Sequence, residues 1–309
     1  HDVIAMADCP LCVPALDALY QQVCGWLRGT AAMAAIARLS LRVARGGAPD
    51  SPEAPDLAHW HDGGFPKGFL TLEASPASTL SPADARHLLD DALAAVPRLA
   101  GALYQGSGDL RVRAGDSSLW ERVLDTTYRI APESFFQVNA RQVPRLVAEV
   151  VDAAQIRKGD VVLDGYCGVG LFSVPLARSA GHVWGIEVAP TAVADAVTNA
   201  SLSGVNDCTF VEGKIERMLR DLKLRRADVV VVDPPRAGCA RQALDAMLSL
   251  APRVFVYVSC DPSTLARDAR IITGADFVLR YAQPIDMFPI SAHIETVAVF
   301  DRLVRAKGS

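Results

Sequence analysis

ADVVVVD, at residues 227–233, is one of five short apolar segments in the second half of the chain; the others are DVVLD (160–164), HVWGIE (182–187), CTFV (208–211) and RVFVYVS (253–259). Stretches with the apolar spacing of helices separate them. Near-continuous runs of Val, Ile and Leu are typical of strands that are buried on both faces. Their alternation with helices therefore predicts a parallel sheet covered by helices on both sides.

The C-terminal end departs from this alternation. FVLRYAQ (277–283) and IETVAVFD (294–301) are joined by a ten-residue loop without a helical pattern. Two strands connected in this way are expected to pair antiparallel. Five β/α units followed by an antiparallel final strand resemble the Rossmann-like methyltransferases. We therefore predict an α/β fold with a mostly parallel seven-stranded sheet whose last strand is antiparallel.

A smaller α+β domain is predicted at residues 1–126, before the methyltransferase-like domain at residues 127–309. Apolar spacing predicts helices and alternation predicts strands in this part. Ser81 followed by Pro82 is a common N-terminal pair of a helix. The expected elements are a helix at 16–29, strands at 37–47 and 68–75, and a helix at 81–99.

Composition limits the class of protein. The 309 residues are 50% hydrophobic and 21% charged, which is typical of a globular chain with two domains. No apolar run approaches the ~20 residues of a membrane span, and the N-terminus lacks the pattern of a signal peptide. A net charge of -4 argues against coating nucleic acid by charge alone, but it leaves room for a local basic groove. We expect a cytoplasmic monomer.

Two groups of residues near the N-terminus invite a metal or stacking role. Cys9 and Cys12 form a single C-x-x-C, and no second pair follows at the spacing of a zinc site. His59, Trp60 and His61 lie in a stretch rich in Pro, Gly and Asp, where a solvated loop is the preferred interpretation. We therefore predict no metal site.

The loop after the first parallel strand is a candidate cofactor site. Ligands of open α/β sheets bind at the carboxyl ends of the strands. The first strand ends at Asp164, and Gly168 and Gly170 follow in a turn that lets a ligand approach the backbone. Glu187 ends the second strand, where a carboxylate can accept hydrogen bonds from both ribose hydroxyls. This pattern fits NAD or S-adenosylmethionine, although Ser173 replaces the third Gly of a dinucleotide fingerprint. A carboxylate that only caps the next helix is the alternative.

A thiol and further carboxylates are expected at the same edge of the sheet. Asp233 ends the fourth strand and Cys260 follows the fifth. Because the final strand runs in the opposite direction, its first residues, Ile294 and Glu295, return to this edge. The topology alone therefore predicts that Cys260 and Glu295 lie at the mouth of the cofactor cleft. The alternative for Cys260 is a buried thiol that packs as a small hydrophobic group.

This pair of groups suits methylation of a pyrimidine carbon. Carbon 5 of uracil is too weak a nucleophile to take a methyl group unaided. A thiolate that adds to carbon 6 creates an enolate, which is reactive at carbon 5. A base must then remove the carbon 5 proton before the thiol can leave.

Several motifs carry a closer resemblance. They are SFFQVN (134–139), LDGYCGVGLFSVPLA (163–177), VVDPPRAG (231–238), VYVSCDPSTLARD (256–268) and DMFPISAHIETVAVFDR (286–302). Together, over residues 126–303, they closely resemble the bacterial uracil-5 methyltransferases that act on tRNA and 23S rRNA.

The resemblance implies a role for individual residues. It implies an RNA substrate, S-adenosylmethionine as cofactor, Cys260 as nucleophile and Glu295 as base. Arg236 holds the flipped uracil or the RNA backbone, or else it closes its own loop. The resemblance implies contacts to cofactor or target base from the following residues: Gln137, Tyr166, Gly168, Glu187 and Asp233.

The sequence departs from the family in two places. Members usually have Leu-Phe where this chain has Gly165 and Tyr166. Many also carry an N-terminal β-barrel and a four-cysteine iron–sulfur site, of which only Cys9, followed by Pro, resembles a ligand. Either the sequence is part of a longer chain or both features are missing, and we expect no intact cluster within it.

Three other functions are alternatives to this interpretation. An amino-methyltransferase shares Asp-Pro-Pro, but it needs an aromatic residue where Arg236 stands and has no use for a thiol. A cytosine-5 methyltransferase would carry Pro-Cys motifs that the sequence lacks. A non-catalytic RNA-binding or folding factor that retains the fold is the alternative from a different class, although both Cys260 and Glu295 are present.

Overall fold

The apolar segments of the second half form the predicted parallel strands. The computed structural model describes residues 12–44 and 68–303. The parallel strands are β7 Val161–Gly165, β8 His182–Glu187, β9 Cys208–Glu212, β10 Val229–Val232 and β11 Val254–Ser259. All residues of β10 and β11 are buried, as the Val-rich runs require.

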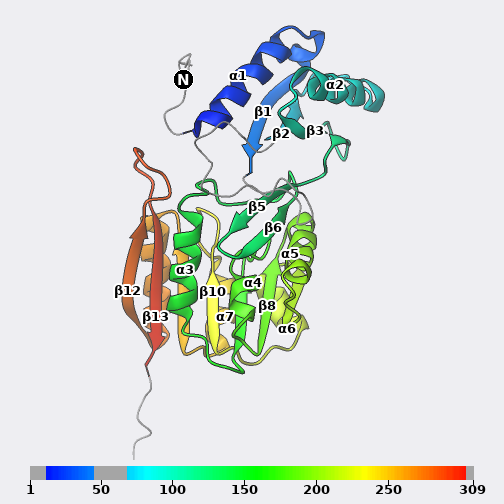
Figure 1. Cartoon of the computed structure of the whole chain (residues 1–309). Helices are drawn as coiled ribbons and strands as arrows, with labels where there is room; N and C mark the ends of the chain where they lie inside the picture. Colours follow the sequence, from blue (N-terminus) through cyan, green and yellow to red (C-terminus); the bar gives the residue numbers. More distant parts are fainter. Residues whose placement is uncertain (1–11, 45–67, 304–309) are drawn as a thin grey trace, which may run out of the picture. The chain divides into compact units, whose positions relative to one another are not determined.

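The last two strands reverse direction. β12 (Phe277–Ile285) and β13 (Glu295–Arg302) pair antiparallel, and β13 also pairs antiparallel with β11. The sheet order is β12-β13-β11-β10-β7-β8-β9, so β13 is inserted between β11 and β12 (Figure 1). The predicted seven-stranded sheet with an antiparallel last strand is confirmed.

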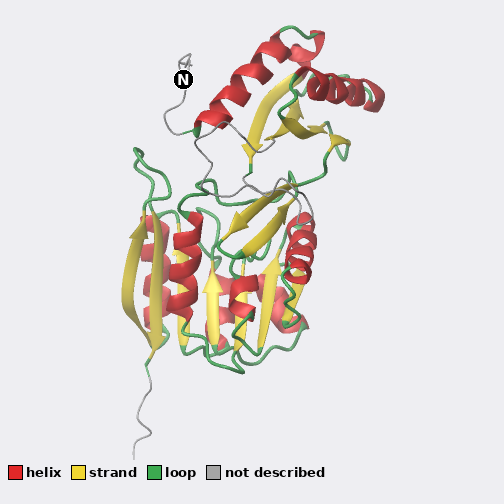
Figure 2. Ribbon diagram, viewed as in Figure 1, coloured by secondary structure: helices red, strands yellow, loops and turns green. Residues whose placement is uncertain are grey.

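Helices cover both faces of this sheet (Figure 2). α6, α7 and α8 pack on one face over a core that includes Val230, Val232, Phe255 and Phe300. α3, α4 and α5 contact the strands from the other side. The helices are α3 Val143–Ala154, α4 Ser173–Ala177, α5 Pro190–Leu202, α6 Ile215–Asp221, α7 Arg241–Ser249 and α8 Pro262–Gly274.

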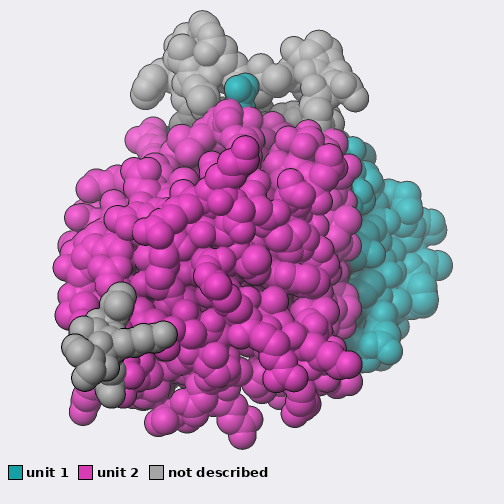
Figure 3. Space-filling view, turned by 90° about the horizontal axis from the view of Figure 1, so that it is seen from below, with its two compact units in different colours: residues 1–122, 129–132 teal, residues 123–128, 133–309 magenta. Residues whose placement is uncertain are grey.

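The chain divides into two compact units, which Figure 3 colours separately. One comprises residues 1–122 and 129–132, and the other comprises residues 123–128 and 133–309. The boundary that the sequence suggested, after residue 126, falls in the hairpin of β5 (Leu119–Val123) and β6 (Thr126–Ile130), whose residues are divided between the two units.

The first unit contains a four-stranded sheet of order β1-β2-β3-β4. Its α2 begins with a capping box, because Ser81 Oγ accepts a hydrogen bond from Asp84 N while the Asp84 carboxylate accepts from Ser81 N. The first 11 residues and the His59–His61 group lie outside the described residues. The elements are α1 Pro14–Arg28, η1 Ala31–Ala35, β1 Ile36–Val43, β2 Gly68–Ala74, α2 Pro82–Ala95, β3 Leu99–Gln105 and β4 Arg111–Gly115.

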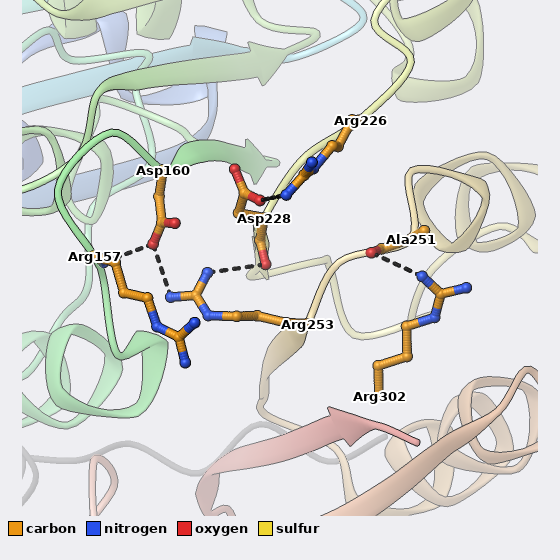
Figure 4. Close-up of a pocket in the computed structure, with 7 residues that line it drawn as sticks. All are labelled: Arg157, Asp160, Arg226, Asp228, Ala251, Arg253 and Arg302. Carbon is orange, nitrogen blue, oxygen red and sulfur yellow. Dashed lines mark hydrogen bonds and ion pairs between the residues drawn. The ribbon is translucent and has the colours of Figure 1, made fainter. Parts of the chain in front are cut away.

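Ion pairs join the amino ends of the central strands (Figure 4). Arg253, before β11, donates to Asp160 Oδ2 at 2.7 Å and to the main-chain oxygen of Asp228 at 3.4 Å. Arg226 binds Asp228 Oδ1 at 2.6 Å. A cavity of about 470 Å³ lies among these residues and Arg302. It sits at the edge opposite to the carboxyl ends, so the predicted site residues do not line it.

The inserted strand β13 should determine the stability of this unit. Phe300 is fully buried and pairs in register with Phe255 on one side and Leu279 on the other. Phe300→Ala should lower the free energy of unfolding by about 3–5 kcal/mol through lost burial and a cavity. Leu279→Ala, at a 45% exposed position of the neighbouring strand, should lower it by about 1 kcal/mol or less. Urea unfolding measures both, and equal losses would contradict this role of β13.

Candidate active site

The loop after β7 turns through left-handed backbone conformations. Gly168 has φ 52° and Gly170 has φ 83°, which favour glycine at both positions. A Cβ at Gly168 would meet no atom within 4 Å, so the surface of the loop is open at this point. The Gly168 N–H donates to Glu187 Oε2 at 3.2 Å. The structure therefore brings Gly168 and Glu187 together, as the sequence predicts for a cofactor site.

The Glu187 carboxylate already accepts three backbone hydrogen bonds. Besides the Gly168 bond, its Oε1 accepts from Val188 N at 2.7 Å and from Ala189 N at 2.9 Å, just before α5. The alternative role of Glu187, to cap the helix that follows it, is thus partly present in the structure. A ribose hydroxyl would use the remaining lone pair of Oε2 or replace the Gly168 N–H.

Tyr166 follows Gly165 at the start of the same loop. The side chain is half-buried and packs against the core under α6, α7 and α8. Burial raises the pKa of the phenol, and the neighbouring Cys239 thiol raises it further. Gly165 beside it is tightly enclosed, because a Cβ there would lie 2.9 Å from Ile215 Cδ1. Tyr166 therefore contributes to packing, and its predicted contact with a cofactor stays a prediction.

Asp164 is a buried carboxyl at the end of β7. Ser173 Oγ donates to its Oδ2 at 2.5 Å, while its Oδ1 has no partner. Burial raises the pKa of Asp164 to about 7, the Ser173 hydrogen bond opposes this shift, and Asp233 and Glu187 raise it further. The sequence placed Asp164 at this edge but assigned it no role. Asp164 is nevertheless a candidate binding residue, because its buried Oδ1 lies next to the glycine loop and could accept a hydrogen bond from a bound molecule.

Gln137 and Asp233 meet across a long sequence separation. Gln137 Nε2 donates to Asp233 Oδ2 at 3.1 Å. The loop that carries Gln137 is held by Asn139, whose Nδ2 donates to the main-chain oxygen of Met287 at 3.1 Å. Burial raises the pKa of Asp233 to about 6, and the Gln137 hydrogen bond opposes this. Both predicted residues thus belong to one hydrogen-bonded pair.

Cys260 and Glu295 lie at the ends of neighbouring antiparallel strands. Ser259 pairs in register with Thr296, so the residue after Ser259 and the residue before Thr296 face the same end of the ladder. Burial raises the pKa of the Cys260 thiol, and the charges of Glu295 and Asp233 raise it further. The strand pairing thus brings Cys260 and Glu295 to one end of the ladder, and their catalytic roles stay a prediction.

Glu295 is almost completely buried. It is 1% exposed, and its Oε1 has no hydrogen-bond partner. Burial raises the pKa of Glu295 to about 8, with a smaller contribution from Asp233. A carboxyl group in such surroundings holds its proton until a partner or a higher pH removes it.

Arg236 and His293 extend the site into the loop 286–294. Arg236 Nη2 donates to His293 Nδ1 at 2.8 Å. The Arg236 guanidinium lowers the pKa of the Cys260 thiol against the effect of burial. His293 packs edge-on against Phe288. His293 was not among the residues predicted for the site, although it lies two residues before Glu295 in the motif at residues 286–302.

A buried aspartate anchors the loop that carries Arg236. The carboxylate of Asp268, on α8, accepts from Tyr257 Oη at 2.7 Å, from Cys239 N at 2.9 Å and from Arg267 Nε at 2.8 Å. Arg267 Nη2 also donates to the main-chain oxygen of Ala237 at 2.9 Å. α8 begins at Pro262, two residues after Cys260. The hydrogen bonds of Asp268 and Arg267 therefore attach the Arg236 loop to the same helix that follows the cysteine.

The raised pKa of Glu295 should make stability depend on pH. A carboxyl group whose folded pKa lies above its unfolded value of 4.5 stabilises the fold at low pH, and this contribution is lost as pH rises through about 8. Relative to Glu295→Gln, the wild type should therefore lose stability between pH 6 and 9. The melting temperatures of the wild type and of Glu295→Gln, measured at pH 6 and at pH 9, check this. A melting-temperature difference that is constant between pH 6 and 9 would contradict the burial of this charge.

The arrangement defines a class of protein. The strand order with an antiparallel β13, a glycine loop after β7 and an acid at the end of β8 is the fold of S-adenosylmethionine-dependent methyltransferases. A crystal structure of Pyrococcus abyssi tRNA (uracil-54, C5)-methyltransferase with S-adenosyl-L-homocysteine matches 97% of this chain and 70% of its own, with a TM-score of 0.69 and 22% identity. This likeness confirms the predicted fold.

The sequence comparison identifies the family. The profile of the tRNA (uracil-5-)-methyltransferases matches residues 118–303, and the chain belongs to this family of S-adenosylmethionine-dependent RNA methyltransferases. Uncharacterized RNA methyltransferases of Oceanobacillus iheyensis and of Staphylococcus aureus (strain MRSA252) are 45% and 40% identical over 61% and 60% of this chain. The matched part spans only 41% and 42% of those relatives. The predicted family is confirmed.

Two features are absent from the described residues, 12–44 and 68–303. No cluster of three or more His, Cys, Asp or Glu side chains there could hold a metal ion. In the same part of the chain, no helix combines the length and the apolar character of a membrane span.

Proposed function

We propose that this chain transfers a methyl group from S-adenosylmethionine to carbon 5 of a uridine in tRNA or 23S rRNA. The observation that carries the proposal is the pairing of β11 with β13, which puts Cys260 and Glu295 at one end of the same ladder. Membership of the tRNA (uracil-5-)-methyltransferase family supports the reaction class.

Cys260 acts as the nucleophile. Its thiolate forms a bond to carbon 6 of the uracil, and the electrons of the carbon 5–carbon 6 double bond move toward the carbon 4 oxygen as an enolate. When bound, S-adenosylmethionine supplies an electrophilic methyl group on a sulfonium. Carbon 5 of the uracil would take this methyl group as the bond between the methyl carbon and the sulfonium sulfur breaks, which leaves S-adenosylhomocysteine. Carbon 5 then carries both the methyl group and its original hydrogen.

Glu295 completes the reaction as the base. In its ionised form, after its own proton has passed to solvent, Glu295 removes the proton from carbon 5. The double bond forms again, and the bond between carbon 6 and the Cys260 sulfur breaks to release the thiolate. A carboxylate with a raised pKa is a stronger base than an exposed glutamate, so burial suits this role. Arg236 stabilises the thiolate form of Cys260 before attack and after release.

The glycine loop and its acidic neighbours would hold the cofactor. Gly168 offers an open backbone surface, and Glu187 retains one acceptor position for a ribose hydroxyl. The unpartnered oxygen of Asp164 is a second acceptor close to this loop. Gln137 and Asp233, which already bind each other, supply amide and carboxyl groups suited to the polar edge of a uracil.

The loops around these groups expose apolar side chains. Phe135 is 66% exposed and Val138 is 72% exposed on either side of Gln137, and Ile290 is 78% exposed in the loop that holds His293. Proteins recognise unpaired RNA by stacking its splayed bases on aromatic side chains, and Phe135 is the aromatic residue of these three. Phe135 therefore supports an RNA substrate whose target uridine leaves its stack.

A non-catalytic RNA-binding factor explains the site less well. Glu295 is buried without a partner for one oxygen, and such a group destabilises the folded state when it ionises. A protein that only binds RNA gains nothing from keeping a thiol and this carboxyl group side by side. Catalysis accounts for both.

The cofactor assignment predicts the effect of one glutamate. Glu187→Ala should weaken S-adenosylmethionine binding by about 1.5–3 kcal/mol, the range for hydrogen bonds to a charged group. Glu212→Ala is the matched control, because Glu212 pairs in register with Glu187 at the end of β9 and is exposed. Calorimetry measures both affinities. Tight NAD binding without S-adenosylmethionine binding would overturn the assignment.

The two catalytic roles predict two different failures. Cys260→Ala should form no covalent bond to RNA, because nothing adds to carbon 6. Glu295→Gln should add and accept the methyl group, and then stall, because an amide cannot remove the carbon 5 proton. A denaturing gel should therefore show an enzyme–RNA adduct for Glu295→Gln alone.

Further samples test the same roles. The wild type should form the adduct with 5-fluorouridine RNA, in which fluorine replaces the departing proton, and the double variant should form none. Normal turnover by Glu295→Gln, or an adduct from Cys260→Ala, would show that these roles are wrong.

A further inference from the structure

Among the described residues of the first unit, helices cover one face of the sheet. α1 and α2 pack on a core that includes Leu70, Leu72, Tyr104 and Ala114 of its strands. Because side chains alternate along a strand, the residues between these point to the opposite face. Part of that face is closed by a small cluster of Ala44, Phe69, Leu103 and Leu119. The rest of this opposite face carries polar side chains.

Arginines lie at both edges of the open part. In the sheet register, Arg38 of β1 pairs with Glu73 of β2, Glu73 with Gln105 of β3, and Gln105 with Arg111 of β4. Arg113, two residues along β4, points to the same face. We call these five residues the arginine face.

The arginine face is accessible. The Arg38 side chain is 71% exposed and that of Glu73 is 37% exposed, at a distance of 3.7 Å between Arg38 Nη1 and Glu73 Oε1. Arg111 and Arg113 are exposed as well. Arg111 Nη1 donates to the main-chain oxygens of Leu110 and Gly108, which keeps its guanidinium at the surface of the turn. An exposed pair such as Arg38–Glu73 contributes little stability, so Arg38 can exchange partners at little cost.

Charge is segregated between the two sides of this sheet. The four strands carry four arginines and one glutamate, whereas α1 and α2 carry four aspartates and two arginines. The chain as a whole has a net charge of -4, so the basic character of the strands is local. A local positive surface on an acidic protein attracts a polyanion to one face only.

We propose that the arginine face binds the phosphate backbone of the RNA substrate. This inference rests on the proposed function, which makes RNA the polyanion that the chain must hold. Arg38 and Arg111 are three strand spacings apart, about 14 Å, which is too far for one small anion to contact both. The aromatic residues of these four strands, Phe69 and Tyr104, are both buried, so bases have no ring to stack on. The contact is therefore to phosphates and independent of base sequence.

A charge-matched pair of double variants tests the proposal. Arg38→Gln with Arg111→Gln removes two charges from the arginine face. Arg28→Gln with Arg86→Gln removes two exposed charges from α1 and α2. For each full-length protein, the dissociation constant for substrate RNA is measured between about 50 and 300 mM KCl. Circular dichroism and melting show that both variants fold.

The first double variant should bind RNA roughly tenfold more weakly at about 0.1 M salt, and its salt slope should fall by about one unit per arginine. The control should bind with the wild-type slope. The loss should be the same for RNAs with different bases, and saturating RNA should restore the wild-type rate of methyl transfer. Equal slopes in the two variants would overturn the proposal, as would loss confined to one base sequence.

Two more outcomes separate the possible failures. If polyglutamate competes at the arginine face as well as RNA of equal charge does, the surface serves an acidic protein and the inference is wrong. If the wild type binds RNA through this face but methylates no uridine, the proposed function fails while the phosphate contact stands.

Discussion

Strand β13 runs against its neighbours, and its insertion between β11 and β12 sets the position of the reactive groups. A parallel strand delivers the residue at its carboxyl end to the ligand edge of the sheet, as β11 delivers Cys260. An antiparallel strand delivers its first residue instead, and here that residue is Glu295. The thiol and the carboxyl group therefore meet because two adjacent strands have opposite directions.

This geometry buries several carboxyl groups at the ligand edge of the sheet. Asp164, Asp233 and Glu295 are all held at raised pKa by burial, and each raises or is raised by another of the set. Such a group of acids opposes folding once it ionises, so the surrounding core must hold it. Two features of the core hold these acids in place. They are the fully buried strands β10 and β11 and the hydrogen bonds to Asp268. The buried strands thus stabilise the unit, whereas the reactive groups lie at the ends of the strands.

The two units differ in the kind of surface that they present. The larger one encloses a small, desolvated set of reactive groups. The smaller one exposes a row of charged side chains on the face of its sheet opposite to α1 and α2. A reaction on one base of a long polyanion needs both kinds of surface, because phosphate contacts supply affinity while the enclosed site selects the reacting atom. The assignment of RNA recognition to the smaller unit stays a prediction.

The sequence by itself determined the strands, their order of appearance and the edge at which the reactive groups gather. Apolar runs and alternation are local patterns, and a parallel sheet of β/α units places all carboxyl ends on one side. Tertiary structure decided which groups touch. The pairing of Gln137 with Asp233, the turn of Glu187 onto the Gly168 N–H, and the contact of Arg236 with His293 join residues that are distant in sequence. The raised pKa of Glu295 arises from burial, which depends on everything packed around the group and has no local signature. The arginine face is a similar case, since only the strand register shows that Arg38 and Arg111 lie in one row.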